Sequence, residues 1–391
     1  MDEPGFTTRA VRQAADTRGA EPISVPIYQS ATFGFQDPEV LADWIRSGKD
    51  AGHVYTRWNN PTREALERVL IELERGERAV SFGSGMAAIT SAFVAMARAG
   101  DHVVSTPDLY GGSYALLTQI LPRWGIEVTL AGSYRTEDLV AAIRPGTKVV
   151  YTETIANPKL TVTDLATLAE ACRDRGVKTL VDNTFASPYL CTPLTMGIDV
   201  VAESTTKYIA GHGDSVGGIV VGDAETVHEV REISVDLGGI MSPLDAWLTL
   251  RGLQTLGLRM DRHTANARVL AEMLEDHEKV DRVWYPGLDS HPDREVAAHQ
   301  LRGASGMITF ELAGGIDAGR RFMEAVEIPR VAPSLGATRT IVTHPATVTH
   351  TQMTAHERHA AGIPDGMIRL SVGIEDPADL LEDFRRALDK A

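Results

Sequence analysis

The stretch KTLVDNTF (178–185), with DVVAESTTKYIAGHGD (199–214) after it, decides the fold of this chain. Each stretch holds a short apolar, β-branched run that ends on polar side chains, which is typical of a buried strand. Similar runs recur at 102–105 (HVVS), 148–152 (KVVYT) and 218–221 (GIVV), and helical patterns separate several of them at 113–124, 136–143 and 165–175. This alternation predicts an α/β fold with a mostly parallel sheet in a large domain.

The flanking segments have a different character. The first 59 residues are rich in Pro, Gly and Thr without a sustained helical period, and they predict an N-terminal arm. A helix is expected from Pro61, and the large domain from 60 to 256. The stretch 244–274 predicts one kinked helix or two. Strands such as MITFEL (307–312) and IRLSV (368–372) then indicate a smaller α+β domain at 257–391.

Composition narrows the class of protein and of partner. A length of 391 residues exceeds an ordinary single core and predicts two packed domains. The net charge of −15 disfavours nucleic acid, and no apolar run approaches the roughly 20 residues that span a membrane. The N-terminus lacks a basic stretch followed by an apolar one, so a cytoplasmic location is expected. Cys172 and Cys191 have neither disulfide spacing nor metal-ligand spacing and are expected to pack in the protein interior. With nucleic acid and membrane disfavoured, the expected partner is a small molecule.

Polar residues that follow apolar runs are the candidates for chemistry, because ligands bind beyond the carboxyl ends of parallel strands. Asp182, Asn157 and Lys207 occupy such positions. SFGSGMAAIT (81–90) adds a glycine loop before an apolar helix, whose free N–H groups suit a phosphate. This loop does not match the dinucleotide or nucleoside triphosphate patterns. Singly, these features describe a turn, a helix cap and a solvated lysine. Together they form the inventory that pyridoxal phosphate (PLP) requires.

Each member of that inventory has a physical task. A nucleophilic lysine must be desolvated or placed near positive charge to lose its proton at neutral pH, and Lys207 follows an apolar strand. An ionised Asp182 keeps a pyridine nitrogen protonated, so that the ring withdraws electrons. Tyr110, in PDLYGGS (107–113), is placed to stack on the ring and to present its hydroxyl to a reacting group.

Other candidates have simpler interpretations. The residues His344, His350, His356 and His359 lie close in sequence but lack an HExxH context, so they predict loop or helix-surface positions and no metal site. Met86, Ile89 and Phe93 have the spacing of a helix face in the core, and the Met86 amide remains available to a phosphate.

Taken in order along the chain, the motifs resemble the PLP-dependent enzymes of cysteine and methionine metabolism. This family includes methionine γ-lyases, cystathionine γ-lyases and γ-synthases, and homoserine-ester sulfhydrylases. The resemblance runs from about Gly5 to the C-terminus and implies the PLP-dependent transferase fold type I. LGLRMDRHTANARVLAEML (256–274) and GGIDAGRRFM (314–323) are most similar to methionine γ-lyases. The motifs that carry the resemblance are YTRWNNPT, SGMAAI, DLYGG, ANP, VDNTFASPYL, STTKY, GHGD and IRLSVGIED.

The resemblance implies a role for each matching position. Lys207 would be the Schiff-base lysine, Asp182 the partner of the pyridine nitrogen and Asn157 a contact of the ring hydroxyl. Tyr110 would stack on the ring and protonate the leaving sulfur. The phosphate would be held by the amides of Gly85 and Met86, by Ser204 and Thr206, and by Tyr55 and Arg57 of a neighbouring subunit. Arg369 would pair with the substrate carboxylate, with Ser334 beside it. The family's shared sites imply a homotetramer built as a dimer of dimers.

Departures from the family pattern leave the reaction open. Methionine γ-lyases usually carry a cysteine where this chain has Gly112, and a Lys-Asp pair where it has Ser234 and Val235. Cystathionine-handling members commonly have a glutamate where this chain has Pro333. The leading interpretation is α,γ-elimination of methionine. The alternatives are γ-replacement on an O-acylhomoserine, which the sulfhydrylase-like run at 337–350 favours, and cystathionine γ-elimination. A scaffold without turnover is disfavoured because the chain retains Lys207, Tyr110, Asp182 and Arg369 together.

Overall fold

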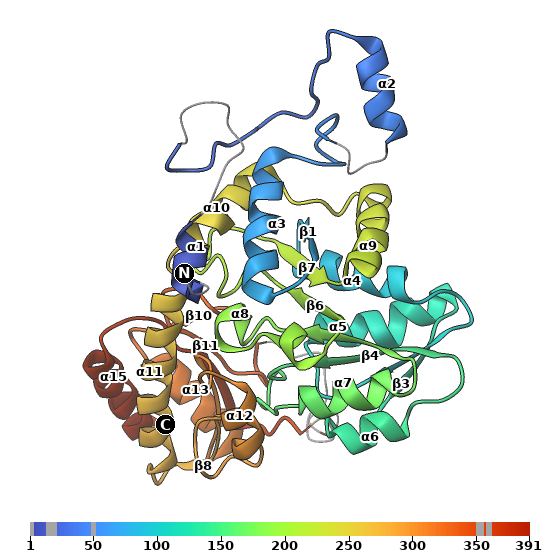
Figure 1. Ribbon diagram of the computed structural model, residues 1–391. Helices are drawn as coiled ribbons and strands as arrows, with labels where there is room; N and C mark the ends of the chain where they lie inside the picture. The colour runs from blue at the N-terminus through green and yellow to red at the C-terminus, as the bar shows by residue number, and fades with distance from the viewer. Residues whose placement is uncertain (1–3, 13–21, 48–51, 349–355, 357–361) are drawn as a thin grey trace.

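The computed structural model describes residues 4–12, 22–47, 52–348, 356 and 362–391 (Figure 1). Its larger sheet has the strand order β1-β7-β6-β5-β4-β2-β3. β7 runs antiparallel to β1 and β6, whereas β6, β5, β4, β2 and β3 pair in parallel. The predicted mostly parallel sheet is therefore confirmed. Its strands are β1 (Arg78–Phe82), β2 (His102–Ser105), β3 (Glu127–Leu130), β4 (Thr147–Glu153), β5 (Lys178–Asp182), β6 (Val200–Glu203) and β7 (Gly218–Gly222).

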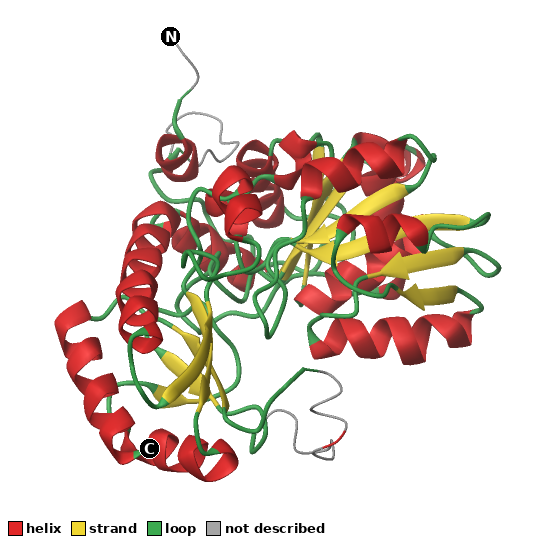
Figure 2. Cartoon of the chain, turned by 90° about the horizontal axis from the view of Figure 1, so that it is seen from below, coloured by secondary structure: helices red, strands yellow, loops and turns green. Residues whose placement is uncertain are grey.

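Helices cover both faces of this sheet, as its two apolar faces require (Figure 2). The stretch predicted as a helix at 113–124 is a short α-helix continued by a π-helical turn (Leu116–Ile120) and a 3₁₀ turn (Leu121–Trp124). A further 3₁₀ turn spans Pro193–Met196. The helices that precede β8 are α1 (Phe6–Val11), α2 (Pro38–Arg46), α3 (Pro61–Glu74), α4 (Gly85–Met96), α5 (Gly111–Ala115), α6 (Thr136–Ala141), α7 (Leu165–Arg173), α8 (Ser187–Leu190), α9 (Ala224–Leu237), α10 (Pro243–Leu253) and α11 (Leu256–Glu275).

A second sheet of five strands has the order β10-β11-β12-β9-β8 and is mainly antiparallel. It confirms the α+β character expected near the C-terminus, and the stretch 244–274 proves to be two helices, α10 and α11. The boundary that we place at residue 256 stays a prediction. The remaining elements are β8 (Val280–Trp284), α12 (Arg294–Gln300), β9 (Met307–Leu312), α13 (Gly315–Ala325), β10 (Arg330–Val331), β11 (Ile341–Thr343), β12 (Met367–Ser371) and α15 (Pro377–Lys390).

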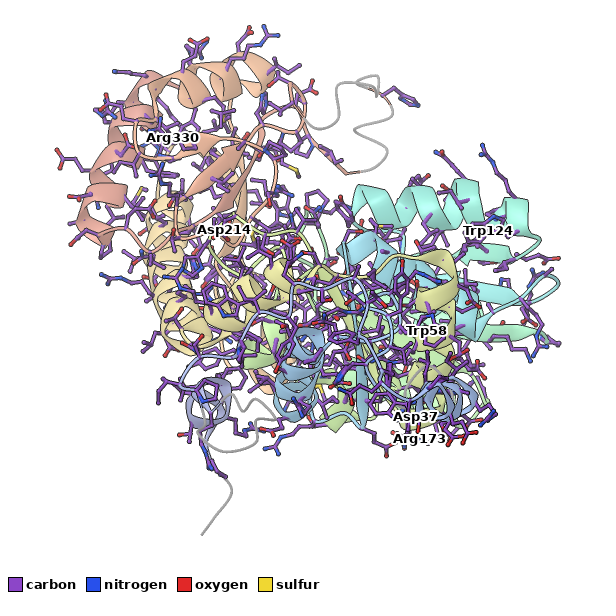
Figure 3. The ribbon with its side chains drawn as sticks, turned by 90° about the horizontal axis from the view of Figure 1, so that it is seen from above. Asp37, Trp58, Trp124, Arg173, Asp214 and Arg330 are labelled. Atoms are coloured by element: carbon purple, nitrogen blue, oxygen red, sulfur yellow. The ribbon has the colours of Figure 1, made fainter. Side chains whose placement is uncertain are left out.

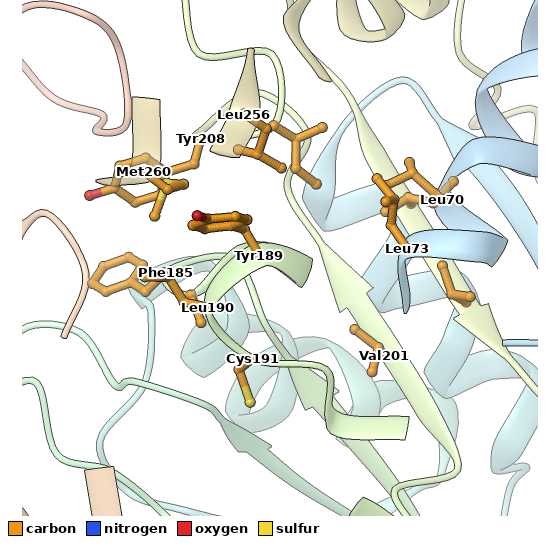
Figure 4. Packing of buried hydrophobic residues seen from close by; sticks show 14 of the residues in the cluster. Leu70, Leu73, Phe185, Tyr189, Leu190, Cys191, Val201, Tyr208, Leu256 and Met260 are labelled. Carbon is orange, nitrogen blue, oxygen red and sulfur yellow. The ribbon is translucent and has the colours of Figure 1, made fainter. Parts of the chain in front are cut away.

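One hydrophobic cluster joins the two sheets (Figure 4). Leu70 of α3 and Val201 of β6 pack in the same cluster as Tyr189 of α8 and Met260 of α11. These side chains are at most 6% exposed, and each large apolar side chain buried this way stabilises the fold by about 1.5–3 kcal/mol. Cys191 lies in this cluster and Cys172 in a smaller one, which confirms that both cysteines pack in the interior.

A buried ion triad holds the base of the N-terminal arm. Glu67 accepts from Arg231 over 2.6 Å and from the Ser81 N–H over 2.8 Å, and Arg63 lies on its other side. Arg63 also donates to the Thr56 carbonyl oxygen over 2.9 Å. By contrast, α2 has no buried residue and projects from the body of the chain (Figure 1). The arm is thus anchored at its base and exposed at its tip.

No helix among the described residues is long and apolar enough to cross a membrane.

Candidate active site

The candidate site lies at one edge of the larger sheet, where the carboxyl ends of β2, β4, β5 and β6 meet. Asp182 is the last residue of β5, and Lys207 lies in the turn that follows β6. Asn157 follows β4, and Tyr110 follows β2. In the view of Figure 3, Asp214, at the end of the GHGD motif, lies between Arg330 of β10 and Trp58. The sheet topology therefore gathers the predicted residues at one edge.

Lys207 is mostly buried and its amine faces the second sheet. Its Nζ donates to Ser334 Oγ over 2.7 Å. Burial, and then the positive charge of Arg369, lower the pKa of Lys207 to about 8, although Asp182 acts in the opposite direction. A substantial fraction of this amine is therefore unprotonated near neutral pH, as a nucleophilic lysine requires.

Arg369 of β12 closes the site from the smaller sheet. One guanidinium nitrogen donates to Asn157 Oδ1 over 3.0 Å, and another donates to the Ser334 carbonyl oxygen over 3.3 Å. Ser334 adopts φ +94°, a left-handed conformation that costs a non-glycine residue free energy and is concentrated at functional sites. Asn157, Lys207, Ser334 and Arg369, drawn from distant parts of the chain, thus form one connected cluster.

Asp182 is a buried carboxyl group whose pKa is influenced by the charge of Lys207. It is 9% exposed, and its Oδ1 accepts from the Thr184 N–H over 2.9 Å. Burial raises the pKa of Asp182, while the Thr184 bonds and the positive charge of Lys207 lower it. Thr184, which the sequence analysis did not identify, also accepts the Ser204 N–H at its Oγ1 over 2.8 Å and so connects β5 to the turn after β6.

The N-terminus of α4 meets the turn after β6 to form a polar cradle. Ser84 caps this helix by accepting the Ala87 N–H over 3.1 Å, which leaves the first-turn N–H groups of Gly85 and Met86 without helical partners. A Cβ atom at Gly85 would lie 2.8 Å from Ser204 Cβ, so only glycine permits this approach. Thr206 Oγ1 accepts the Gly217 N–H over 3.0 Å beside it. N–H groups and hydroxyls at a helix N-terminus suit a phosphate.

Tyr110 is held by a residue that the sequence analysis missed. Its N–H donates to Glu153 Oε1 over 2.6 Å, and its ring is 49% exposed. Glu153, the last residue of β4, is buried, and burial and then Asp182 raise its pKa well above the usual range. The available signal was an acid that ends a buried strand four residues before Asn157.

Tyr55 and Arg57 lie apart from this cluster. The Arg57 guanidinium carbon is 5.5 Å from the centroid of the Tyr55 ring, and Arg57 donates to the Val235 carbonyl oxygen near the end of α9. Tyr55 is 42% exposed. Within the described ranges, no hydrogen bond or ion pair joins either side chain to Lys207, Ser204 or Thr206.

The departures from the family pattern have defined positions. A Cβ atom at Gly112 would lie 2.6 Å from Tyr110 Cε1 and 2.9 Å from Met86 Sδ, so the tyrosine ring packs over this glycine. Pro333 is exposed, while Ser234 and Val235 are buried in α9. Ile89 and Phe93 are core residues as predicted, and Met86 is partly buried against them.

His344 lies in the loop after β11, one of the two kinds of position predicted for it, but not at the surface. Its ring is fully buried and contacts the Asp365 carbonyl oxygen over 2.8 Å, because a buried imidazole with partners at both nitrogens packs well in a core. His356 is exposed, and His350 and His359 lie outside the described residues. Among the residues that the structure describes, no cluster of His, Cys, Asp or Glu could hold a metal ion.

These residues fit PLP on geometric grounds. The site combines an amine of lowered pKa, a buried carboxyl group and a cradle that a Cβ atom at Gly85 would fill. Lys207 would hold the cofactor covalently, Asp182 would face its ring nitrogen, and the cradle would take its phosphate.

Comparison with known proteins agrees with this geometry. The family model described as Cys/Met metabolism PLP-dependent enzyme matches residues 7–389. An L-methionine γ-lyase of Porphyromonas gingivalis is 44% identical over 388 residues, 98% of this chain and 97% of that protein. A cystathionine γ-lyase of Bacillus subtilis is also 44% identical, over 94% of each chain. The crystal structure of cystathionine γ-synthase from Xanthomonas oryzae pv. oryzae, with aminoacrylate and cysteine, has a TM-score of 0.92 and 41% identity, covering 99% of this chain and 98% of that one.

Proposed function

Because the chain belongs to the Cys/Met metabolism PLP-dependent enzyme family, we propose that it catalyses α,γ-elimination of L-methionine or a close sulfur amino acid. The products are a thiol, ammonia and 2-oxobutanoate. When bound, PLP supplies the electron-withdrawing ring that makes the substrate's α and β protons removable. The remaining tasks belong to side chains of this protein.

The observation that carries the proposal is the cluster of Lys207, Ser334, Arg369 and Asn157. Arg369 is positioned by two hydrogen bonds, to Asn157 Oδ1 (3.0 Å) and the Ser334 carbonyl oxygen (3.3 Å), and it offers a planar fork to the substrate carboxylate. A carboxylate held there places the α-carbon next to the Lys207 amine. With a pKa lowered to about 8 by burial and Arg369, that amine can accept and return a proton near neutral pH.

Tyr110 is the proposed proton donor to the departing sulfur. Its N–H is fixed to Glu153 over 2.6 Å, whereas its half-exposed ring is free of the packed core. In the proposed reaction, the Tyr110 hydroxyl lies within reach of the substrate's sulfur. Protonation of the sulfur lets it leave as a neutral thiol, which is the step that distinguishes elimination at the γ-carbon from simple transamination.

Methionine is proposed as the substrate because neither Gly112 nor Pro333 offers a carboxylate to a distal ammonium group. Gly112 adds no side chain beneath the Tyr110 ring, and Pro333 stands where cystathionine-handling members commonly have a glutamate. The relatives do not separate the candidates, since methionine and cystathionine γ-lyases match at the same 44% identity. The second candidate is therefore γ-replacement on an O-acylhomoserine, which the likeness to cystathionine γ-synthase favours.

We further propose a homotetramer, a dimer of dimers, in which Tyr55 and Arg57 reach the phosphate of a neighbouring subunit. Both residues lie at the base of the arm, Arg57 donates to the Val235 carbonyl oxygen rather than to a residue of the cradle, and Tyr55 is 42% exposed. A residue that contributes to the site from another copy requires an assembly of at least two chains.

A substrate panel tests the proposed reaction. Purified protein loaded with PLP would be incubated with methionine, homocysteine, cystathionine, cysteine, and O-acetylhomoserine with and without sulfide. We expect 2-oxobutanoate and methanethiol from methionine at the highest kcat/KM. Homocysteine and acetate formed from O-acetylhomoserine and sulfide, with little 2-oxo acid from methionine, would favour γ-replacement instead.

A further inference from the structure

Glu153 makes a pair of contacts that no step of the proposed reaction uses. It is the last residue of β4 and is 4% exposed. Its Oε1 accepts the Tyr110 N–H over 2.6 Å, and its Oε2 accepts the Asn157 N–H over 3.1 Å. One buried carboxyl group thus spans two loops that leave neighbouring strands of the sheet.

The two loops share this contact. Tyr110 directly precedes the five-residue helix α5 and is 49% exposed, so the hydrogen bond from its N–H to Glu153 helps to fix the backbone from which the ring extends. Asn157 in turn accepts from Arg369 over 3.0 Å. A shift of Glu153 would therefore reach the proposed proton donor directly and the proposed carboxylate-binding arginine through Asn157.

We infer that Glu153 is a positioning residue of the active site, whose carboxyl group fixes Tyr110 and Asn157 relative to each other. The inference rests on the proposed roles of these two residues. An outer contact ties the same loops together, because Lys159 Nζ bonds Asp108 Oδ1 over 2.8 Å. That pair is partly exposed and contributes little by itself, whereas the Glu153 carboxyl group links the loops from the buried side.

The chain offers a matched control for Glu153. Glu203 is the last residue of β6, 1% exposed, and also a buried carboxyl group at the same edge of the sheet. Its Oε1 accepts from Asn183 Nδ2 over 3.2 Å, and it contacts neither Tyr110 nor Asn157. Glu203→Gln therefore removes a comparable buried acid without loosening the two loops, since the glutamine carbonyl still accepts from Asn183.

The experiment compares Glu153→Ala, Glu153→Gln and Glu203→Gln by PLP affinity, kcat/KM and Tm. The Kd for PLP is titrated on apoenzyme, so this readout does not require turnover. We expect Glu153→Ala to raise Kd about 10- to 100-fold, as loss of an outer hydrogen-bond partner does at other bound groups. Its kcat/KM should fall about 100-fold, the effect of a misplacement of about 1 Å. Glu153→Gln keeps one acceptor oxygen and should lie between Glu153→Ala and the wild type.

Glu203→Gln should stay within about twofold of the wild type in Kd and kcat/KM, even where its Tm falls. Equal effects of Glu153→Gln and Glu203→Gln on Kd and kcat/KM would overturn the inference, and this comparison decides it if Glu153→Ala does not fold. A wild-type enzyme that binds PLP but leaves methionine intact would contradict the proposed reaction, while the Kd comparison would still test Glu153.

Discussion

Lys207 Nζ donates to Ser334 Oγ over 2.7 Å, although 127 positions separate the two residues in the chain. The contact joins the turn after β6 to the loop between β10 and β11 of the second sheet. Gly336 makes the close approach possible, because a Cβ atom there would lie 2.6 Å from the Tyr208 backbone nitrogen and the residue has φ +77°. The reactive amine is therefore placed by both parts of the fold.

Lys207 should be the residue that PLP modifies. Reduction of the loaded protein with borohydride, followed by peptide mapping, should mark Lys207, because its amine has a pKa of about 8 while exposed lysines stay protonated. Lys207→Ala should abolish the mark, and Lys178→Ala, which removes a partly exposed lysine bonded to Asp223, should leave it in place. A label on any other lysine would refute this assignment.

The rate of covalent PLP attachment should depend on pH with a midpoint near 8. The lowered pKa of Lys207 means that the unprotonated amine accumulates as pH rises through about 8, so the rate rises over that range and levels off above it. Arg369 is the largest charge that lowers this pKa, and Arg369→Gln should move the midpoint to higher pH. Arg330→Gln, an exposed arginine of the same sheet, is the control and should leave the midpoint unchanged.

The shared site predicts complementation between inactive subunits. Arg57→Ala and Lys207→Ala homomers should each be inactive, because one lacks the phosphate contact from the arm and the other lacks the cofactor lysine. After subunit exchange, a mixed dimer holds one site with both native residues, and activity should return to roughly a quarter of the wild-type value, given random pairing. Exchange demonstrated by tagged subunits without recovery of activity would exclude a shared site.

The triad of Arg63, Glu67 and Arg231 should contribute more to the free energy of unfolding than an exposed ion pair does. Glu67→Ala leaves two buried guanidinium groups without their carboxylate, and we expect a loss of about 3–5 kcal/mol in the free energy of unfolding. Glu272→Ala breaks the exposed pair with Arg268 and should cost about 0.3–0.5 kcal/mol. Denaturant unfolding of the PLP-free proteins measures both, and equal losses would show that the triad does not anchor the arm's base.

The fold could be predicted from local pattern where that pattern was unambiguous. β2 (HVVS) and β7 (GIVV) are apolar and β-branched, and each was recognised as a strand. β1 (RAVSF) was missed because this five-residue strand runs directly into the glycine loop, and it is not distinguishable from the start of the following helix. β3 (EVTL) was missed because Glu127 and Thr129 interrupt its apolar residues, so it shows no continuous apolar run.

The candidate site was predictable only in its parts. Asp182 and Lys207 stand at strand ends, where a parallel sheet collects ligand-binding residues. The bond between Arg369 and Asn157 spans 212 positions, and no local pattern encodes such a pairing. Glu153 escaped notice because its partners are backbone N–H groups, which every residue but proline has and which leave no trace in sequence.

Substrate specificity should follow from the lack of a charged side chain at Gly112 and Pro333. Methionine carries an uncharged thioether, whereas cystathionine carries a second ammonium and carboxylate at its far end. Burying an ammonium without a partner costs several kcal/mol, while each buried methylene gains only about 0.8 kcal/mol. With Pro333 exposed and Gly112 bare beneath the ring, we expect kcat/KM for methionine to exceed that for cystathionine by at least about tenfold, with ethionine tolerated.

Gly112→Cys probes the same space from the opposite side. A Cβ atom at Gly112 would lie 2.6 Å from Tyr110 Cε1, so the ring must move to admit the new side chain. We expect this variant to lose activity on ethionine more than on methionine, because the displaced ring narrows the space for longer thioethers. Gly111→Cys is the matched control, since a Cβ atom there meets nothing within 4 Å.

The decisive quantity for substrate specificity is the wild-type ratio of kcat/KM for methionine to that for cystathionine. A ratio below one would mean that a charge partner for the distal ammonium exists, and it would reassign the reaction to cystathionine γ-elimination.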